Sequence, residues 1–311
     1  MSASHFESHP QPIVSVVIPT MGRPTLRRAV LSASQQTGVS TKVLVVVDGT
    51  TDSGSLDLSG VEGNIEILQS QPKSSGGAKR AIGTRAATTP WVAYLDDDDF
   101  WLAEKLSRQL RFYESLKPDE LPIISCCFRY DFENKKSKSI PSQPYDNGDV
   151  AEYLFRKRSL SARRHTLHTS TILISTDLAV KHNWDGSLKR HQDWDFVIRV
   201  TQDPKCRLIQ VPESLAVVSF GSSESMSRTM DWDASLRWAS QYRKVWSDST
   251  YSDFVIGQVL RYALGSGEIK GISSALREIR GLPLPSLEAI LLSLTSLLSP
   301  KIFLTAIRKT S

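Results

Sequence analysis

The segment Trp91-Val92-Ala93-Tyr94-Leu95-Asp96-Asp97-Asp98-Asp99 runs from five largely apolar residues directly into four carboxylates. The apolar residues predict a buried strand, and because successive strand residues face opposite sides, Asp96 and Asp98 would project the same way. Carboxylates crowded at the end of one strand repel one another unless a cation lies between them. Their hard oxygen ligands suit Mg²⁺ or Mn²⁺. The segment therefore predicts a metal site at the end of a strand.

A simpler interpretation of the same carboxylates is that Asp98 or Asp99 caps a helix. The sequence predicts that helix at residues 100–116. An acidic residue stabilises a helix N-terminus as a hydrogen-bond acceptor and through the helix dipole. A cap needs only one carboxylate, so it leaves the others unexplained.

Strands and helices alternate in the residues that precede this segment. Apolar runs predict buried strands at 13–19, 42–47 and 64–68, with helices at 24–36 and after Gly76-Gly77. This alternation predicts an α/β fold with a mostly parallel, Rossmann-like central sheet flanked by helices. Ligands of such sheets bind beyond the carboxyl ends of the strands, where Thr20, Asp48 and Asp96 to Asp98 would meet.

The second half of the chain is less regular. We predict strands at 121–130 and 171–174, a polar loop at 134–148 between them, and a helix at 192–201. After Gly221 the pattern becomes helical, with helices predicted at 232–246, 251–264 and 269–280.

The composition is that of an ordinary enzyme. Of 311 residues, 40% are hydrophobic and 23% charged, which excludes disordered and fibrous classes. The net charge of +5 is too small to indicate a nucleic-acid partner, and we predict none. The chain has three cysteines, an odd number, and the neighbours Cys126 and Cys127 would make a poor disulfide. A reducing compartment is therefore expected. Residues 1–12 predict a flexible N-terminus without a secretory signal, hence a cytoplasmic protein.

The motifs along residues 13–200 resemble, in content and order, those of family 2 glycosyltransferases with the GT-A fold. The matching segments are VSVVIPT at 14–20 with Arg23-Pro24, VVVDGTTD at 45–52, GGAKRAIG at 76–83, LDDDD at 95–99 and HQDWD at 191–195. LDDDD resembles the family's DxD motif, and HQDWD resembles its acidic pair before Trp-Asp. The ordered set is far more specific than any single motif.

This resemblance implies a GT-A catalytic domain at 13–221 and a helical C-terminal extension at 222–311. The catalytic domain would divide into a nucleotide-sugar-binding half at 13–99 and an acceptor half at 100–221. The implied reaction is an inverting, metal-dependent transfer of a sugar from a nucleoside diphosphate sugar to a glycan or lipid-linked acceptor in polysaccharide biosynthesis. An inverting mechanism is a single displacement and needs no covalent nucleophile.

Site residues follow from the matching positions. The resemblance implies that Asp193 is the catalytic base and that Asp98 holds Mn²⁺ or Mg²⁺. A base of this kind takes the proton of the acceptor hydroxyl, and a metal stabilises charge on the leaving diphosphate. The expected nucleotide-sugar-binding residues are Pro19, Thr20, Arg23, Asp48, Arg80, Asp96 and Asp97.

Two departures from the family pattern concern these sites. Ala81 stands where Asn is common, and Gln192 stands where Glu is common, which leaves Asp193 as the only acid of its pair. The register of the four aspartates also stays open, with Asp96 and Asp98 preferred as the DxD pair and Asp97 and Asp99 as the alternative.

Structural interpretations of single residues stay open as well. Arg80 would be a solvated helix residue, Asp48 the first residue of an Asp-Gly turn, and Asp193 a helix N-terminal acid. The histidines His165, His168, His182 and His191 lack the partners of a zinc site and are expected on the surface or in loops.

Other functions compete with glycosyl transfer. A sugar-1-phosphate nucleotidyltransferase would need a Gly-rich loop directly after the first strand, where this chain has Pro19-Thr20-Met21-Gly22-Arg23. A noncatalytic nucleotide-sugar-binding module would tolerate loss of the base and of the metal carboxylates, yet both are present.

The C-terminal tail predicts a helix with one apolar face, formed by Leu287, Leu291, Leu294 and Leu298 and followed by Lys301, Arg308 and Lys309. The segment is too short and too interrupted to span a bilayer, which takes roughly 20 apolar residues. Residues 284–309 would either lie on the inner face of the membrane or pack on protein, because both options need the same amphipathic pattern. The basic residues between Arg156 and Arg164 would be solvated or would contact phosphate or anionic lipid.

Overall fold

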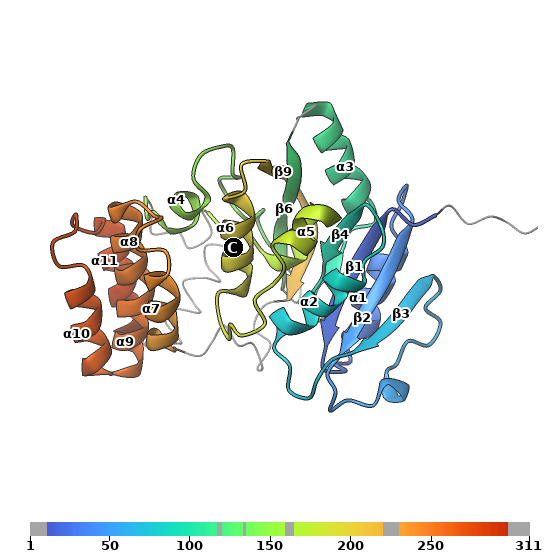
Figure 1. Ribbon diagram of the computed structural model, residues 1–311, viewed down its shortest axis with the longest axis horizontal. Helices are drawn as coiled ribbons and strands as arrows, with labels where there is room; N and C mark the ends of the chain where they lie inside the picture. Colours follow the sequence, from blue (N-terminus) through green and yellow to red (C-terminus); the bar gives the residue numbers. More distant parts are fainter. Residues whose placement is uncertain (1–10, 117–119, 133–134, 159–164, 220–229, 298–311) are drawn as a thin grey trace, which may run out of the picture.

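The computed structural model describes residues 11–116, 120–132, 135–158, 165–219 and 230–297 (Figure 1). Their strands form one sheet in the order β3-β2-β1-β4-β8-β6-β9-β5, with β7 paired to β6. The strands are β1 Val14–Thr20, β2 Thr41–Val47, β3 Asn64–Gln69, β4 Trp91–Tyr94, β5 Phe100–Trp101, β6 Leu121–Phe132, β7 Lys135–Lys136, β8 Leu173–Ser175 and β9 Cys206–Ser219.

The helices divide into those of the sheet and those that follow it. The first set is α1 Leu26–Ser34, α2 Gly76–Ala86, α3 Lys105–Leu116, α4 Val150–Phe155, α5 Thr176–Lys181 and α6 Gln192–Thr201. The second set is α7 Trp232–Ser240, α8 Asp248–Phe254, the π-helix η4 Val255–Leu260, α9 Arg261–Ser266, α10 Ile269–Glu278 and α11 Leu287–Leu294. We call this second set the C-terminal extension.

The first four strands confirm the predicted parallel sheet. β1 pairs in parallel with both β2 and β4, and β2 pairs in parallel with β3. Every residue of β1 is buried because helices cover both faces. Val14, Val16 and Ile18 pack with α1, whereas Val17 packs on the opposite face with Ala81 of α2. Alternate residues of one strand thus enter two separate cores.

Helix α2 lies unusually close to the sheet because it carries small residues. A Cβ atom on Gly83 would lie 2.3 Å from Cγ1 of Val17, so only glycine fits this contact. The helix begins at Ser75, whose hydroxyl accepts a hydrogen bond from the Ala78 amide at 3.0 Å. This close packing brings Arg80, one turn into α2, to the carboxyl edge of the sheet.

Strands β5 and β9 differ most from the sequence-based expectation, whereas β6 and β8 lie where strands are predicted. Phe100 and Trp101, predicted as the start of a helix, form the short strand β5, which pairs antiparallel with Val217 and Ala216 of β9. Helix α3 begins only at Lys105. Strand β9 itself was not predicted, although it pairs in parallel with β6 along most of its length.

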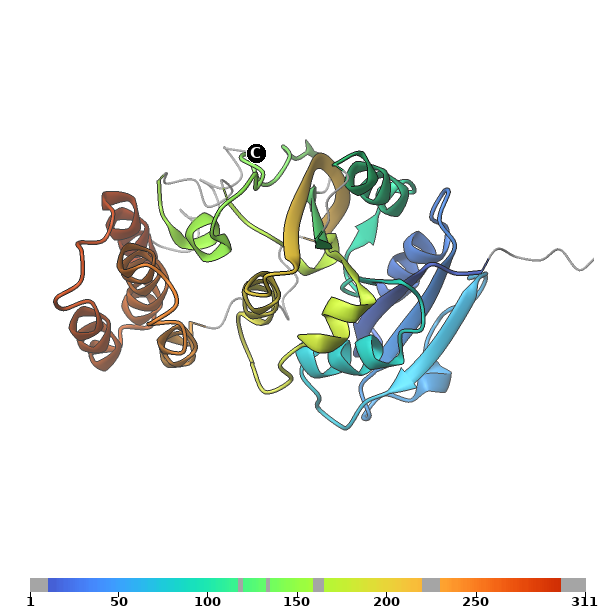
Figure 2. The ribbon, with the colours of Figure 1, turned by 45° about the horizontal axis from the view of Figure 1, so that its top comes forward.

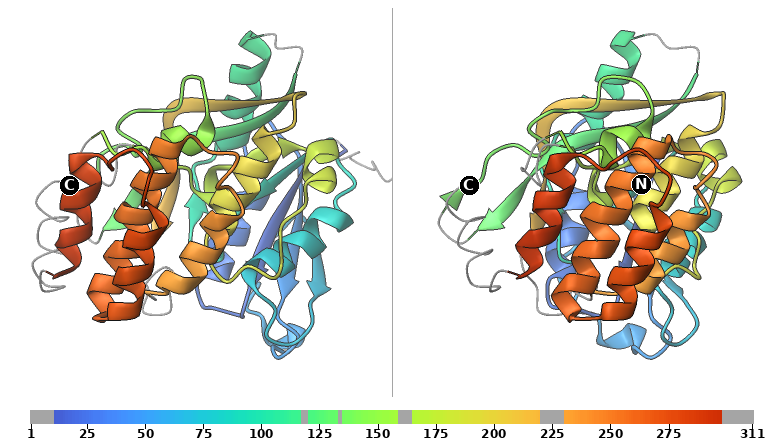
Figure 3. Two further views of the ribbon diagram at one scale, coloured as in Figure 1. Left: turned by 60° about the vertical axis from the view of Figure 1, so that its left-hand side comes forward. Right: turned by 90° about the vertical axis from the view of Figure 1, so that its left-hand side faces the viewer.

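The C-terminal extension packs against the sheet-containing part of the chain through aromatic side chains. Phe155 contacts Trp238, Trp246 and Phe254, with ring centroids 4.9–6.0 Å apart. Helix α6 lies between the sheet and the extension (Figures 1 and 2). The helices of the extension lie side by side (Figure 3). The expected division at 221/222 falls among residues outside the described ranges.

Candidate active site

The carboxyl ends of β1, β2 and β4 meet at one edge of the sheet, as predicted. A cavity of about 270 Å³ opens there. Its lining includes Arg80 from α2, Asp96 after β4, His168, Asp193 from α6, and Gln258 and Tyr262 from the extension. The cavity therefore joins residues from α2, the end of β4, the segment before β8, α6 and the extension.

The four aspartates after β4 have different surroundings. Asp97 accepts hydrogen bonds from the Thr20 hydroxyl at 2.6 Å and from Nη1 of Arg23 at 2.9 Å. Asp98 lies further out, with its carboxylate 3.5 Å from the same Arg23 nitrogen. Burial raises the pKa of both carboxyls above the usual value. Thr20, Arg23 and Asp97 thus form one connected group, while Pro19 is buried beside them in β1.

Asp96 and Asp99 point toward His168. One oxygen or ring nitrogen from each of these three residues lies within 4.8 Å of the other two, which is suitable for a shared metal ion. Asp99 accepts hydrogen bonds from the Ser170 hydroxyl at 2.5 Å and the Ser219 amide at 2.9 Å. Burial and the neighbouring Asp96 and Asp98 carboxylates raise the pKa of Asp99 to about 7. A bound cation would favour the ionised form, so the donor set fits a divalent metal.

The capping interpretation of these aspartates is wrong. Helix α3 begins at Lys105, so neither Asp98 nor Asp99 lies at its N-terminus. Asp99 is instead a buried carboxylate held by Ser170 and Ser219.

Arg80 is buried rather than solvated, which overturns the structural alternative for this residue. Its guanidinium donates to the Asp96 carboxylate and, at 3.2 Å, to the side-chain oxygen of Gln192. The same group lies 4.9 Å from the ring centroid of Trp184. Burial raises the pKa of Asp96, but the charges of Arg80 and His168 outweigh this effect and lower it overall. Arg80 therefore connects the end of β4 to the start of α6.

Asp48 has the contacts of a turn-forming residue. Its fully buried carboxylate accepts from the Thr50 hydroxyl at 2.7 Å, the Lys73 amide at 3.0 Å and Nζ of Lys79 at 3.3 Å. Burial opposes ionisation, but these hydrogen bonds hold the pKa of Asp48 well below its usual value. Lys79 also donates to the Thr20 carbonyl at 3.2 Å, so it joins β1 to β2. The role of Asp48 in binding the nucleotide base stays a prediction.

Asp193 stands in the first turn of α6 and lines the cavity with Asp96 and Arg80. One of its oxygens accepts from the Trp194 amide at 2.9 Å. Burial raises the pKa of Asp193, which makes the carboxylate a stronger base than an exposed aspartate. Trp194 also lines the cavity.

Two residues further along α6, Asp195 ties this helix to the C-terminal extension. Its buried carboxylate accepts from the Trp238 indole at 3.0 Å, the Tyr242 hydroxyl at 2.7 Å and Nε of Arg199 at 2.7 Å. Both carboxylate oxygens of Asp195 therefore accept hydrogen bonds from protein groups. Such a buried, fully bonded carboxylate fixes the position of α6.

His191, directly before α6, makes a second connection to the extension. It adopts a left-handed backbone conformation with φ of 58°, which is uncommon outside glycine. Its ring stacks on Trp194 at 4.9 Å, and Nε2 lies 2.9 Å from the Ser235 hydroxyl. Burial and the charge of Arg190 lower the pKa of His191 to about 3, so the ring is neutral at physiological pH.

Comparisons with known proteins place this arrangement in a family. Residues 15–181 match the model described as glycosyl transferase family 2. This chain belongs to glycosyltransferase family 2. Membership agrees with the order of motifs and disfavours the nucleotidyltransferase alternative.

Curated relatives of this glycosyltransferase carry the same general description. An uncharacterized glycosyltransferase, MJ1057 of Methanocaldococcus jannaschii, is 24% identical over 64% of this chain and 69% of its own length. The amylovoran biosynthesis glycosyltransferase AmsB of Erwinia amylovora is 29% identical over 54% of this chain and 57% of its own.

Solved structures support the GT-A fold. Residues 1–349 of TarS from S. aureus, in complex with UDP-GlcNAc, superpose with a TM-score of 0.61 over 86% of this chain and 80% of that one. The sequence identity is 15%, so this likeness concerns the fold.

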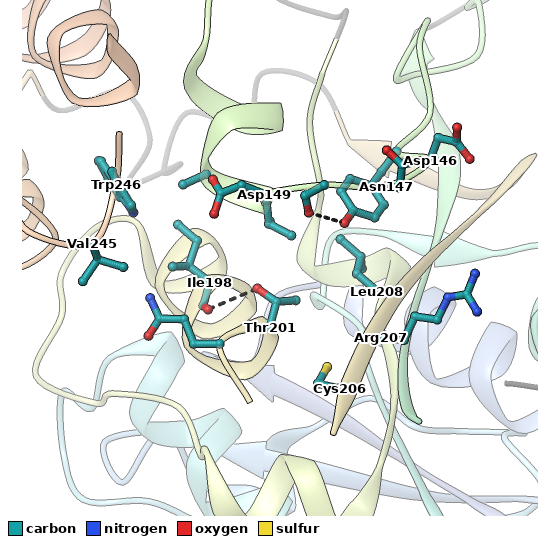
Figure 4. Close-up of a pocket in the computed structure, with 15 residues that line it drawn as sticks. Asp146, Asn147, Asp149, Ile198, Thr201, Cys206, Arg207, Leu208, Val245 and Trp246 are labelled. Carbon is teal, nitrogen blue, oxygen red and sulfur yellow. Dashed lines mark hydrogen bonds between the residues drawn. The ribbon is translucent and has the colours of Figure 1, made fainter. Parts of the chain in front are cut away.

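The glycosyltransferase has a second cavity, of about 280 Å³, at the other end of α6 (Figure 4). Ile198 and Thr201 of α6, Asp149 before α4 and Trp246 of the extension line it. None of the predicted site residues lies there, so the cavity at Asp193 is the candidate active site.

Sequence analysis missed two residues of this active site. The sequence predicts His168 on the surface or in a loop, because the histidines have neither a Cys partner nor the helical spacing of a zinc site. Ser170, which donates to Asp99 and accepts from the Asp96 amide at 3.1 Å, was not considered. Both precede β8, the strand that pairs with β4. The polar run His168-Thr169-Ser170-Thr171 before a buried strand was the signal available.

Proposed function

We propose that this glycosyltransferase moves a sugar from a nucleoside diphosphate sugar to a hydroxyl of a glycan or lipid-linked acceptor, with inversion at the anomeric carbon. The observation that carries this proposal is the position of Asp193. This carboxylate, with its raised pKa, lines the same cavity as Asp96 and Arg80 at the carboxyl edge of the sheet.

In the proposed reaction, Asp193 accepts the proton of the acceptor hydroxyl while the oxygen of that hydroxyl bonds to the anomeric carbon. The bond from that carbon to the diphosphate oxygen breaks, and the diphosphate leaves with the electron pair. Arg80 forms an ion pair with Asp96. In the proposed complex the same guanidinium would also balance negative charge on the phosphates of the donor. General-base assistance of this kind contributes about 10²–10⁴-fold to a rate.

A divalent cation, Mn²⁺ or Mg²⁺, fits the carboxylate cluster. Asp96, Asp99 and His168 would hold it, and the mixed oxygen and nitrogen donors favour Mn²⁺ over Mg²⁺. When bound, such an ion stabilises negative charge on a leaving diphosphate. Asp98, the metal ligand predicted from the sequence, lies outside this group. Separate substitutions of Asp98 and Asp99 distinguish the two possible ligand sets.

The nucleotide would bind beside Thr20, Arg23 and Asp97. These residues lie at the ends of β1 and β4, where parallel sheets bind ligands. The TarS structure, which holds UDP-GlcNAc, makes uridine nucleotides the first donors to test.

We further propose peripheral contact with the inner face of the cytoplasmic membrane through residues 284–309. In α11 the predicted apolar face is exposed, with Leu287 67%, Leu291 40% and Leu294 46% accessible, whereas Ala289 and Ser293 face the protein. Among the described residues this face is thus partly to largely exposed; Leu298 and the basic residues beyond it lie outside the described ranges. Among the described helices, none has the length and apolar character to span a bilayer.

Exposed apolar side chains followed in sequence by basic residues suit an anionic membrane surface. Sedimentation with anionic liposomes at low salt, lost on truncation before Leu284, is the expected result.

The proposed activity is tested by titrating the purified protein with a panel of uridine, guanosine, thymidine and cytidine diphosphate sugars, with and without Mn²⁺. Calorimetry should detect metal-dependent binding of at least one donor, and that donor should be hydrolysed slowly without an acceptor. A protein that binds none of them contradicts the proposal.

A further inference from the structure

The C-terminal extension reaches the cavity of Asp193 through two side chains. Gln258 belongs to the π-helix η4, and Tyr262 belongs to α9. They lie four residues apart and so share a face of the helical segment. Both line the cavity together with Asp193. The extension therefore forms a wall of the candidate active site in addition to supporting α6.

The π-helix aims Gln258 at this cavity. Segments of π-helix are rare and occur often at functional sites. The flanking residues Gly257 and Val259 are buried, whereas Gln258 is partly exposed. Within the described part of the chain, the Gln258 side-chain amide forms no hydrogen bond. Its oxygen and nitrogen can therefore bind hydroxyl groups of a ligand.

Tyr262 offers a second polar group beside it. Its hydroxyl accepts a hydrogen bond from Nη2 of Arg190 at 2.6 Å, and the Arg190 guanidinium lies 4.7 Å from its ring centroid. A phenol that accepts one hydrogen bond still has its own hydrogen to donate. Arg190 therefore fixes the hydroxyl in place without using up its donor.

Trp194 completes this part of the cavity with apolar surface. An amide, an oriented hydroxyl and an aromatic ring together match a saccharide, which presents hydroxyl groups around an apolar ring face. Asp96 and His168, proposed to hold the metal, line the same cavity as Gln258 and Tyr262, whereas Thr20, Arg23 and Asp97, proposed to bind the nucleotide, do not line it. The chemistry and the location of this wall thus match an acceptor sugar.

We propose that Gln258 and Tyr262 bind the acceptor saccharide and orient its hydroxyl toward Asp193. This inference rests on the proposed glycosyl transfer. It assigns acceptor recognition to helices that lie beyond the segment matched by the family model, which ends at residue 181.

The test uses the full chain with UDP and Mn²⁺ present. The probes are methyl β-glucoside, methyl β-galactoside and methyl N-acetyl-β-glucosaminide, detected by saturation-transfer NMR. Wild-type protein should bind at least one of them. Gln258→Ala and Tyr262→Phe should each weaken that binding about tenfold, the effect of one lost hydrogen bond at the upper end of its range, while UDP binding stays unchanged.

Matched controls come from the same extension. Gln241→Ala removes an exposed amide outside the cavity, and Tyr251→Phe removes a hydroxyl that donates to Glu278 at 2.7 Å. Both should bind the probe sugar as wild type does. Unchanged sugar binding in Gln258→Ala and Tyr262→Phe overturns the proposal, and so does a wild-type protein that binds UDP but no glycoside. A wild-type protein that does not bind UDP contradicts the proposed function instead.

Discussion

The donor side and the acceptor side of the carboxyl edge of the sheet are built from different stretches of the chain. On the side that we assign to the donor, Thr20, Arg23 and the aspartates after β4 come from the ends of neighbouring parallel strands within the first 99 residues. On the acceptor side, Asp193 belongs to α6, and the partners of α6 come from Trp238, Tyr242 and Ser235 in the extension.

This difference predicts that donor binding and sugar transfer can be altered separately. The donor side depends on strand order and on close packing of α2, so it belongs to the fold itself. The acceptor side depends on contacts between Asp195 of α6 and extension residues 43 and 47 positions later in the chain. Changes in the extension should therefore affect transfer and leave donor binding intact.

The largest effect on ligand binding is expected on the donor side. Asp99→Asn removes a carboxylate from the group that includes Asp96 and His168, and should weaken Mn²⁺-dependent UDP binding by about 10²-fold, because even residues behind the ligands of a metal contribute 10–100-fold. Asp98→Asn should have a smaller effect. Calorimetry with and without Mn²⁺ distinguishes them. The opposite order would support Asp98 as the metal ligand, as predicted from the sequence.

The next effect concerns pH and the acceptor side. The pKa of His191 is lowered from 6.5 to about 3 by burial and by Arg190, so below pH 6.5 the unfolded chain binds a proton that the folded protein does not. Stability contributed by the neutral ring is therefore complete above pH 6.5 and is lost as the pH falls toward 3.

Between pH 7 and pH 5, wild type should lose up to about 2 kcal/mol more unfolding free energy than His191→Asn, at 1.4 kcal/mol per pH unit below 6.5. Asparagine is neutral throughout and tolerates the left-handed backbone of this position. Urea unfolding at the two pH values measures the difference. Identical pH dependence in both proteins would show that His191 does not carry it.

A smaller effect is expected from weakening the hydrogen bonds between Asp195 of α6 and the extension. Tyr242→Phe deletes one of the hydrogen bonds to Asp195 and should lower kcat about tenfold with unchanged KM for the donor, because a displaced base loses alignment. Tyr251→Phe deletes a similar hydrogen bond, to Glu278, that does not touch α6. If kcat falls equally in Tyr242→Phe and Tyr251→Phe, the loss reflects a less stable extension and the positioning role of Asp195 is contradicted.

Much of the donor side was predictable because its signals are local. Strands β1 to β4 and the positions of Thr20 and Asp96 to Asp98 follow from apolar runs and from the rule for parallel sheets. Helix α6 was also predicted at its observed bounds, since its apolar spacing and first-turn acids are contained in ten residues.

The parts that were not predicted depend on distant pairing. Phe100 and Trp101 suit a helix or a strand equally, and only their pairing with β9, more than 100 residues later, decides for a strand. Strand β9 contains Pro212 and Glu213, which break its apolar pattern at the irregular register opposite Cys126 and Cys127. His168 approaches Asp99 only because β8 pairs with β4, and no spacing in the sequence encodes that contact.

The central claim is that Asp193 is the base of the transfer reaction and takes no part in donor binding. The most direct measurement is the Asp193→Asn variant, assayed for donor binding by calorimetry and for sugar transfer by product release. We predict donor affinity equal to wild type and transfer reduced by about 10²–10⁴-fold. Transfer within a few-fold of wild type would contradict the account.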